Sequence, residues 1–302
     1  MNCISWNCCG LGNPGTVQEL VHLVREKDPT VLFLSEPWTN EDCLEVLRCR
    51  FHFSNKFVVK RINKGGGLAL FWKNDINLSI NSYSLSHIDT IVDGHTVNPW
   101  PFTCFCGAPK THLRENSWNL LRTLKNQHHL PWCCVGDFNE IIRNSEKSGC
   151  RNQSERQMQR FRNVIDDCGF IDLGFRGFPF TWCNNRRGSA TTWLRLDRFM
   201  ATNEWVLRFH TAVIHHLDSV ASDHKPIWMN PYPIYMASAP DGDCSVLRIC
   251  GGMTSPVSPQ SPRHGSQEPK GHPWNKFRQK LADAVKSSKN GVGFSLVMSQ
   301  NN

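Results

Sequence analysis

Residues 132–139 read WCCVGDFN: four apolar residues, then glycine, aspartate, phenylalanine and asparagine. A short apolar run bounded by turn-forming residues predicts a buried strand over Trp132–Val135 that ends at Gly136. The polar residues Asp137 and Asn139 then follow the end of the strand, where a rigid sheet can hold reactive groups in a loop. The stretch therefore predicts a strand that delivers two polar side chains to the edge of a sheet.

Similar apolar runs recur along the chain up to Met229. Strands are predicted at Cys3–Trp6, Thr30–Leu34, Leu68–Trp72, Asn77–Asn81, Ile88–Val92, Phe102–Cys106, Phe178–Cys183, Thr191–Leu196 and His224–Met229. Helices are predicted at Glu115–His128 and Ser154–Cys168, and another after a capping box formed by Thr16 and Glu19. Many strands with few covering helices indicate a layered α/β sandwich rather than a strictly alternating parallel fold.

Composition divides the 302 residues into two parts. Residues 1–229 carry the apolar periodicity of a folded domain. Residues 230–302 are predicted to be a Pro/Ser-rich linker or disordered tail, largely irregular, in which apolar periodicity suggests a short helix near 274–285. No apolar run approaches the ~18 residues that cross a bilayer, and the N-terminus lacks the features of a secretory signal. We therefore expect an intracellular protein that is not secreted and has no membrane partner.

Net charge and cysteine content limit the classes of partner that the protein is expected to have. The 34 basic and 26 acidic residues give a net charge of +8, which favours polyanionic partners without proving one. The fourteen cysteines include no C-x-x-C pair and lie mostly in apolar runs. They are therefore predicted to be reduced, buried side chains rather than a zinc site or a disulfide framework.

Polar residues with metal-ligand or acid–base chemistry stand at the ends of several apolar runs. Each alone has an ordinary explanation as a turn residue, but together they form an oxygen-rich set without Cys/His pairs, which suits Mg²⁺ or Mn²⁺ rather than zinc. The adjacent pair Asp223 and His224 suits proton handling or charge stabilisation near a phosphate. The set suggests metal-assisted phosphoester hydrolysis and consists of Asn7, Glu36, Asp137, Asn139, Asp197, Asp223 and His224.

The same residues carry a family resemblance. Residues 1–229 resemble the endonuclease/exonuclease/phosphatase superfamily, the DNase-I-like fold, and within it the endonuclease domains of plant non-LTR (LINE-type) retrotransposons. The matching motifs are ISWNCCGLG (4–12), LFLSE (32–36), GGGLALFW (65–72), GDFNEI (136–141), FTW (180–182), RLDR (195–198) and SDHKPI (222–227). The resemblance implies a four-layer α/β/β/α sandwich and a monomeric Mg²⁺-dependent (or Mn²⁺-dependent) hydrolase. Its partner would be DNA, nicked to leave a 3′-hydroxyl, and it would act in the nucleus on chromosomal DNA.

The resemblance also implies a role for each residue. Asn7 and Glu36 would hold the cation, and Asp223 would support the metal or the water network. Asp137 would position or deprotonate the attacking water, while Asn139 would hold the scissile phosphate. His224 would stabilise developing charge on the phosphate, and Asp197 would orient it. The expected contacts to DNA, at or near the site, are made by Asn139, Thr181, Trp182 and Ser222.

One departure from the family leaves an alternative open. The family usually has a tyrosine that contacts the phosphate where this sequence has Cys106, and a thiol is a shorter and weaker hydrogen-bond donor than a phenol. The alternative is a catalytically impaired, truncated retrotransposon remnant that folds and at most binds nucleic acid.

Overall fold

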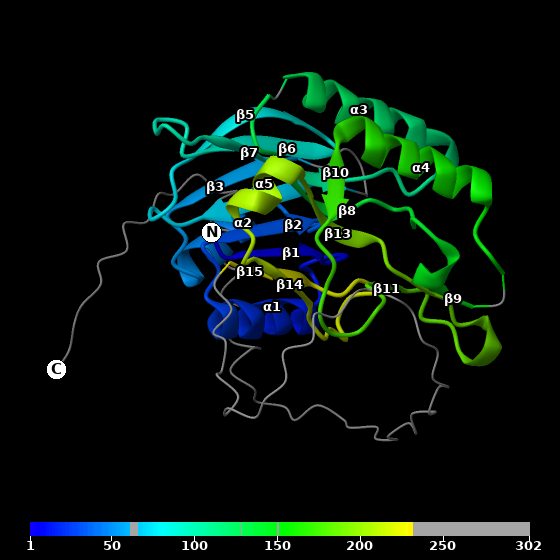
Figure 1. Ribbon diagram of the computed structural model, residues 1–302. Coiled ribbons are helices and arrows are strands. Elements are labelled where there is room, and N and C mark those ends of the chain that lie inside the picture. The colour runs from blue at the N-terminus through cyan, green and yellow to red at the C-terminus, as the bar shows by residue number, and fades with distance from the viewer. Residues whose placement is uncertain (61–65, 128, 150, 232–302) are drawn as a thin grey trace, which may run out of the picture. The chain divides into compact units, whose positions relative to one another are not determined.

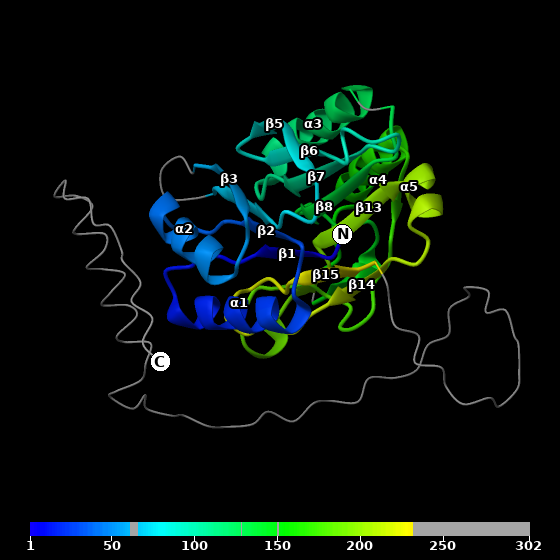
Figure 2. The same cartoon turned by 90° about the vertical axis from the view of Figure 1, so that its left-hand side faces the viewer.

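Two β-sheets pack face to face, and helices cover the outer face of each (Figure 1). The computed structural model describes residues 1–60, 66–127, 129–149 and 151–231. Helices α1 (Pro14–Lys27) and α2 (Glu41–Arg50) lie outside the first sheet, and α3 (Arg114–Gln127) and α4 (Glu155–Cys168) lie outside the second (Figure 2). The predicted four-layer α/β/β/α sandwich is therefore confirmed.

Each main sheet has six strands. The first runs in the order β14 (Val213–His216), β15 (Ile227–Asn230), β1 (Cys3–Asn7), β2 (Val31–Ser35), β4 (Leu68–Trp72) and β3 (Asn55–Val59). The second runs in the order β10 (Phe170–Asp172), β13 (Asp197–Thr202), β8 (Cys133–Asp137), β7 (Trp100–Cys106), β6 (His87–Val92) and β5 (Leu78–Ser84). Smaller elements are β11 (Trp182–Cys183), β12 (Trp193–Leu194) and β9 (Lys147–Ser148), which form a third sheet, α5 (Asn203–Arg208), and the 3₁₀ turns Thr111–Leu113, Asn144–Glu146 and Gly188–Ala190.

Parallel pairing occurs once in each main sheet and decides where polar residues meet. Strands β1 and β2 are parallel, with Asn7 opposite Ser35. Strands β7 and β8 are also parallel, with Cys106 opposite Asp137. Because parallel strands end at the same edge, the residues that follow β1 and β2 lie side by side, as do those at the ends of β7 and β8.

The main core lies between the two sheets. Cys3 and Phe33 of the first sheet pack in one cluster with Cys104 and Val135 of the second, all fully buried. Strands β1, β2 and β8 are buried along their whole length, which is why they read as continuous apolar runs rather than alternating ones. The eleven cysteines among the described residues are free thiols, and those in the strands fill the core as small apolar groups.

A second core lies between the second sheet and its helices. Trp118 of α3 stacks on Phe161 of α4 at a centroid distance of 4.8 Å, and both pack on Trp132 and Phe138. The 3.6-residue spacing of the apolar residues in α3 and α4 therefore reflects a helix face turned toward a sheet.

The predicted capping box at Thr16 and Glu19 is wrong. Helix α1 begins at Pro14, and its N-cap is Asn13, whose side chain accepts the Gly15 N–H at 2.9 Å. The Glu19 carboxylate instead accepts the N–H groups of residues 220 and 221 at 3.1 and 3.0 Å, and the Thr16 hydroxyl donates to the carbonyl of residue 221 at 3.4 Å. Both side chains therefore hold the segment that precedes His224, a long-range contact that local spacing does not reveal.

Other differences concern short or polar elements. The predicted strands at Phe178–Cys183 and Thr191–Leu196 shrink to the two-residue strands β11 and β12. The elements that were not predicted include α2, β3, β10, α5, β14 and the buried strand β13, which starts at Asp197, directly after the predicted strand. Apart from Asn230 and Pro231, the predicted tail at 230–302 with its helix near 274–285 lies outside the described residues.

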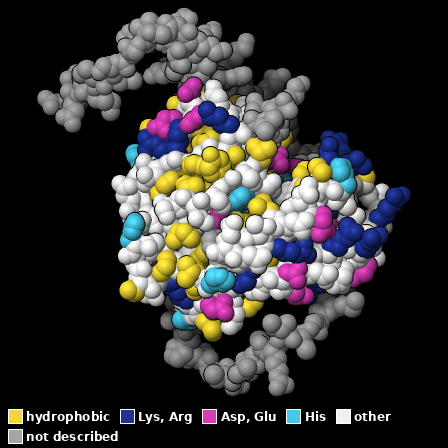
Figure 3. Space-filling model, turned by 90° about the horizontal axis from the view of Figure 1, so that it is seen from above, with side chains coloured by type: hydrophobic (Ala, Val, Ile, Leu, Met, Phe, Trp, Pro, Cys, Tyr) yellow, Lys and Arg dark blue, Asp and Glu magenta, His cyan; other side chains and the backbone are white. Residues whose placement is uncertain are grey.

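Helix hydrophobicity and surface charge both concern the kinds of partner that the protein can bind. Within the described part of the chain, no helix is both long enough and apolar enough to cross a membrane. The face seen in Figure 3 interleaves Lys and Arg side chains with Asp and Glu rather than gathering one sign of charge. That face therefore offers no extended basic surface for a polyanion.

Candidate active site

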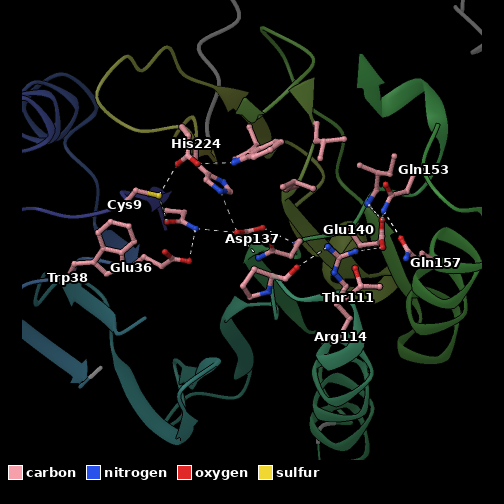
Figure 4. Close-up of a pocket in the computed structure, with 18 residues that line it drawn as sticks. Cys9, Glu36, Trp38, Thr111, Arg114, Asp137, Glu140, Gln153, Gln157 and His224 are labelled. Atoms are coloured by element: carbon pink, nitrogen blue, oxygen red, sulfur yellow. Dashed lines mark hydrogen bonds and ion pairs between the residues drawn. The ribbon is translucent and has the colours of Figure 1, made fainter. Parts of the chain in front are cut away.

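A cleft of about 530 Å³ opens where strand ends of the two sheets meet. Asn7 and Glu36 reach it from the ends of β1 and β2, and Asp137 and Asn139 reach it from the end of β8. His224, just before β15, completes the group (Figure 4). The structure thus brings residues far apart in the sequence into one cavity.

Asn7 and Glu36 form one side of the site. The Asn7 side-chain N–H group donates to the Asp137 carboxylate at 3.2 Å and to the Glu36 carboxylate at 3.4 Å. This orientation turns the amide oxygen of Asn7 away from Asp137, toward the thiol of Cys9, from which it accepts a weak hydrogen bond at 3.4 Å. Glu36 is partly exposed in the cleft and adopts a φ of 53°, a conformation that is uncommon outside glycine and concentrates at functional sites.

Asp137 is the most tightly held carboxylate in the cleft. One of its oxygens accepts the backbone N–H of Asn139 at 2.8 Å, and the other accepts the Asn139 side chain at 2.9 Å. Asn139 is anchored in turn by donating to the carbonyl of Gly107 at 2.9 Å. Burial raises the pKa of Asp137, against the opposing charge of His224 and with a further increase from Asp197. A raised pKa makes this carboxylate a better proton acceptor.

His224 and Asp197 form a buried pair behind Asp137. The Nδ1 atom of His224 lies 2.9 Å from the Asp197 carboxylate, and Nε2 lies 3.7 Å from that of Asp137. Burial alone would lower the pKa of His224, but the negative charges of Asp197 and Asp137 outweigh it and raise the pKa above its usual value. The imidazole is therefore held as a cation between two carboxylates, and these three groups place ligand-type atoms within 4.8 Å of one another.

Asp223 has different hydrogen-bond partners from its neighbour His224. One carboxylate oxygen accepts the Cys9 thiol at 2.9 Å, and the other accepts the Trp182 indole N–H at 2.9 Å. Burial raises the pKa of Cys9, and the hydrogen bond to Asp223 adds to the increase, so the sulfur remains a protonated thiol. The cleft therefore presents hard oxygen atoms and no thiolate to a cation.

These seven residues lie in the part of the chain that a family model covers. The model of the endonuclease/exonuclease/phosphatase family matches residues 4–224. The chain belongs to this family. The resemblance inferred from the sequence motifs is thereby confirmed, and the chain is a hydrolase of the endonuclease/exonuclease/phosphatase type.

Several solved structures have the same fold as this chain. The 3′ phosphatase NExo from Neisseria, bound to a product DNA hairpin, is 16% identical, with 76% of this chain and 98% of that chain covered and a TM-score of 0.57. The endonuclease domain of TRAS1, a telomere-specific non-LTR retrotransposon, is 12% identical, with 76% and 97% covered and a TM-score of 0.56. An AP endonuclease from Archaeoglobus fulgidus is 15% identical, with 78% and 100% covered and a TM-score of 0.58. Curated proteins give no match, and at these identities the structures show the shared fold alone.

Two of the residues expected to contact DNA have supporting positions instead. Thr181 is 0% exposed, and its hydroxyl accepts the N–H groups of Leu196 and Asp197 at 2.9 and 3.0 Å. Ser222 donates to the Asn7 carbonyl at 2.9 Å and accepts the His224 N–H at 3.1 Å. In this family member both hydroxyls fix the backbone of site residues, while the half-buried Trp182 lines the cleft.

A buried ion-pair network supports the strand that carries Asp197. Arg198 is fully buried and contacts Glu146 at 2.5 Å and Asp172 at 2.7 Å, and Arg195 contacts Asp172 at 2.7 Å. The arginines of the RLDR motif therefore point away from the cleft into this ion-pair network, which is defined here by Arg195, Arg198, Glu146 and Asp172. Because buried charges need partners, the two arginines of the motif have a structural role.

Several residues that line the cleft were not predicted from the sequence. Arg114, at the start of α3, contacts the buried Glu140 at 2.5 Å, and Gln153 donates to Glu140 at 3.0 Å. These form the wall opposite Trp38 and Cys9, with Asp137 between the two walls (Figure 4). Glu140 lies within the quoted GDFNEI motif, which could have indicated it, whereas no local signal marks Trp38.

Cys106 lies behind the cleft rather than in its lining. It ends β7, opposite Asp137, and packs against the core between the sheets. Burial raises the pKa of its thiol well above the usual value, and the charges of Asp137 and Glu36 add to the increase. A protonated thiol in this position is not a nucleophile.

Proposed function

We propose that this family member is a divalent-metal-dependent DNA endonuclease of the retrotransposon type, which nicks DNA and leaves a 3′-hydroxyl. The observation that carries the proposal is the meeting of a cation-binding pair, Asn7 and Glu36, with a proton acceptor, Asp137, and a charged imidazole, His224, in one cleft. Each of these three kinds of group can lower the barrier to phosphodiester hydrolysis, by offsetting charge on the phosphate or by activating water. The TRAS1 domain among the structural relatives supports the retrotransposon type.

The donor set fits Mg²⁺ or Mn²⁺. Asn7 and Glu36 offer an amide oxygen and a carboxylate, the hard ligands these cations prefer, and Asp223 lies within the same cavity to hold bound water. Cys9, a thiol that lines the cleft, donates a hydrogen bond to Asp223 and stays protonated, so it is not available as a soft ligand. When bound, such a cation polarises the phosphate and offsets its negative charge.

The protein side chains accept the proton of the attacking water and stabilise the charge on the phosphate. Asp137, held by Asn139 and raised in pKa, accepts a proton from the water whose oxygen attacks phosphorus. The new bond joins that oxygen to phosphorus while the bond to the 3′ oxygen breaks, and the 3′ oxygen takes a proton from solvent. His224, kept cationic by Asp197, stabilises the negative charge that develops on the phosphate oxygens.

A plasmid assay with the full chain tests the proposal. We expect supercoiled plasmid to be nicked with Mg²⁺ or Mn²⁺ and not with EDTA, and the nick to prime a DNA polymerase without phosphatase treatment. His224→Asn should lower the rate ~10²- to 10³-fold, since it removes a preorganised charge, and Glu36→Gln should raise the cation concentration needed. The matched controls are His22→Asn and Glu26→Gln, on the exposed face of α1. A folded wild-type chain that does not nick would overturn the proposal.

Cys106 motivates the alternative of a catalytically impaired chain that binds nucleic acid without cutting it. Cys106→Tyr restores the phenol of the family, and Cys106→Phe is its matched control without the hydroxyl. Under our proposal Cys106→Tyr changes nicking little, because Asp137, His224 and Glu36 are already in place. A large gain specific to the tyrosine would support the impaired alternative.

The remaining expectations follow from the substrate. A chain that nicks chromosomal DNA acts in the nucleus, and a cleft built from one copy of the chain is compatible with a monomer. Fractionation of cells and sedimentation of the purified full chain test these two points.

A further inference from the structure

Trp38 is an exposed indole on the cation-binding side of the cleft. Its side chain is 41% exposed, although it is among the largest apolar groups in the protein. It lines the cleft two residues after Glu36 and lies beside Glu36 and Cys9 (Figure 4). The mechanism proposed above gives this side chain no role.

The indole is held by the turn that follows β1. The backbone of Glu36 accepts the Gly10 N–H at 2.9 Å, and that of Pro37 accepts the Leu11 N–H at 2.8 Å. Trp38 adopts a φ of 44°, and its six-membered ring lies directly over Gly10, where a Cβ atom would approach Cε3 to 2.9 Å. The absence of a side chain at Gly10 thus leaves room for the six-membered ring, and the exposed part of the indole lines the cleft.

The electrostatics of this side of the cleft call for an uncharged contact. Glu36 and Asp223 present carboxylates here, which repel a phosphate unless a cation bound at Glu36 offsets their charge. An aromatic face attracts nucleobases without depending on positive charge, because every base has a π-face. A phosphate bound next to Glu36 also brings its own nucleotide to this wall.

We propose that Trp38 stacks on a nucleobase next to the scissile phosphate and selects DNA steps whose bases leave the helical stack readily. In a regular duplex both faces of a base are covered by its neighbours, so the indole reaches only a base that has unstacked. Pyrimidine–purine steps, mismatches and bulges unstack at the lowest cost. This inference rests on the proposed function, because it assumes that DNA occupies the cleft.

Equilibrium binding in EDTA tests the stacking contact without cutting. The probe is a short duplex with 2-aminopurine in a single-nucleotide bulge, compared with the same base paired to thymine. Trp38→Leu keeps an apolar side chain without a flat ring, and Trp38→Phe keeps a flat ring. Tyr83→Ala, at a residue 61% exposed on β5, is the control for loss of an exposed aromatic elsewhere.

Stacking is worth about 1–3 kcal/mol per base, which corresponds to a ~5- to 150-fold loss of affinity. We expect this loss for the bulged duplex with Trp38→Leu, a smaller loss with Trp38→Phe, and none with Tyr83→Ala. The wild type should quench the 2-aminopurine fluorescence, and Trp38→Leu should not. The slope of affinity against salt should stay unchanged, because no phosphate contact is removed.

Two results would overturn the inference. One is an affinity of Trp38→Leu for the bulged duplex within about twofold of wild type. The other is an equal loss for bulged and paired duplexes accompanied by weaker Mn²⁺ binding, which would show that the loop of Glu36 had been disturbed. Binding and quenching by a wild type that does not nick plasmid with Mg²⁺ would refute the endonuclease proposal while supporting the Trp38 contact.

Discussion

Replacing Asp197 by asparagine separates the charge of this side chain from its shape. The carboxylate lies 2.9 Å from Nδ1 of His224, and both side chains are buried. Asparagine fills the same volume, and its oxygen can still accept the Nδ1–H hydrogen bond. What is lost is the negative charge that keeps the imidazole cationic.

The size of the effect follows from this single buried contact. A hydrogen bond to a charged group contributes ~1.5–3 kcal/mol and one between neutral groups ~0.5–1.5 kcal/mol, so loss of the charge alone costs ~1–1.5 kcal/mol, where 1.36 kcal/mol corresponds to a factor of ten in rate. If the pair acts mainly in the transition state, kcat falls about 5- to 13-fold while KM changes little. Asp197 also helps to raise the pKa of His224, so its removal lowers that pKa and moves the alkaline limit of nicking to lower pH.

Nicking rates of the full chain across the neutral and alkaline range measure both effects. Asp218→Asn, at an exposed residue paired with Lys225, controls for the loss of one negative charge. If Asp197→Asn cuts within about threefold of wild type with an unchanged pH profile, then Asp197 neither sustains the charge of His224 nor contributes to the rate. Asp197 would then be a structural residue of β13.

Three further predictions concern stability. Glu146→Gln removes one carboxylate of the ion-pair network and should lower the free energy of unfolding, measured by urea denaturation, by ~3–5 kcal/mol. The control Glu155→Gln, at an exposed ion pair, should lower it by less than ~1 kcal/mol. Equal losses in the two variants would contradict this prediction. Burial opposes the ionised form of Asp172, but the two arginines outweigh it and lower its pKa to about 2, so the stability from this carboxylate is present above ~pH 4. It should be lost as the pH falls toward 2, which acid unfolding curves of wild type and Asp172→Asn can check. Gly136→Ala should yield no folded protein by circular dichroism, since its Cβ would lie 1.9 Å from a carbonyl oxygen of β7, whereas Gly12→Ala, with open space around it, should fold normally.

Strands β1, β2 and β8 could be predicted because their signal is local, whereas β13, which carries Asp197, was not predicted. Strand β8 and its two polar followers, Asp137 and Asn139, are visible in eight consecutive residues, and the parallel pairing of β1 with β2 explains why Asn7 and Glu36 meet. The family could be predicted because seven such motifs occur in order. Asp197 could be placed next to His224 only through the resemblance, since 27 positions separate them.

The features that the sequence did not reveal all depend on contacts distant in the chain. Thr16 and Glu19 have the spacing of a capping box, but they bind a segment about 200 residues away. Thr181 is polar and lies in a motif, yet the structure buries it beneath Asp197. Trp38 follows a metal-ligand candidate by two positions, and only the packing of its ring on Gly10 in the structure shows that the ring faces the cleft rather than the core.

The division of the site between two sheets has a consequence for how such a chain loses activity. Under the proposed function the cation-binding pair belongs to the first sheet and the proton acceptor to the second. Two contacts join the halves: the hydrogen bond of 3.2 Å from Asn7 to Asp137, and the contact of 2.9 Å between His224, just before β15, and Asp197 of β13. The distance between the halves is therefore set by the thickness of the core beneath them, where Cys3, Phe33, Cys104 and Val135 interlock. A methyl group gained or lost at those positions alters the spacing of the catalytic groups without touching any of them. Drift in the interior can thus silence such an enzyme while every catalytic residue remains intact.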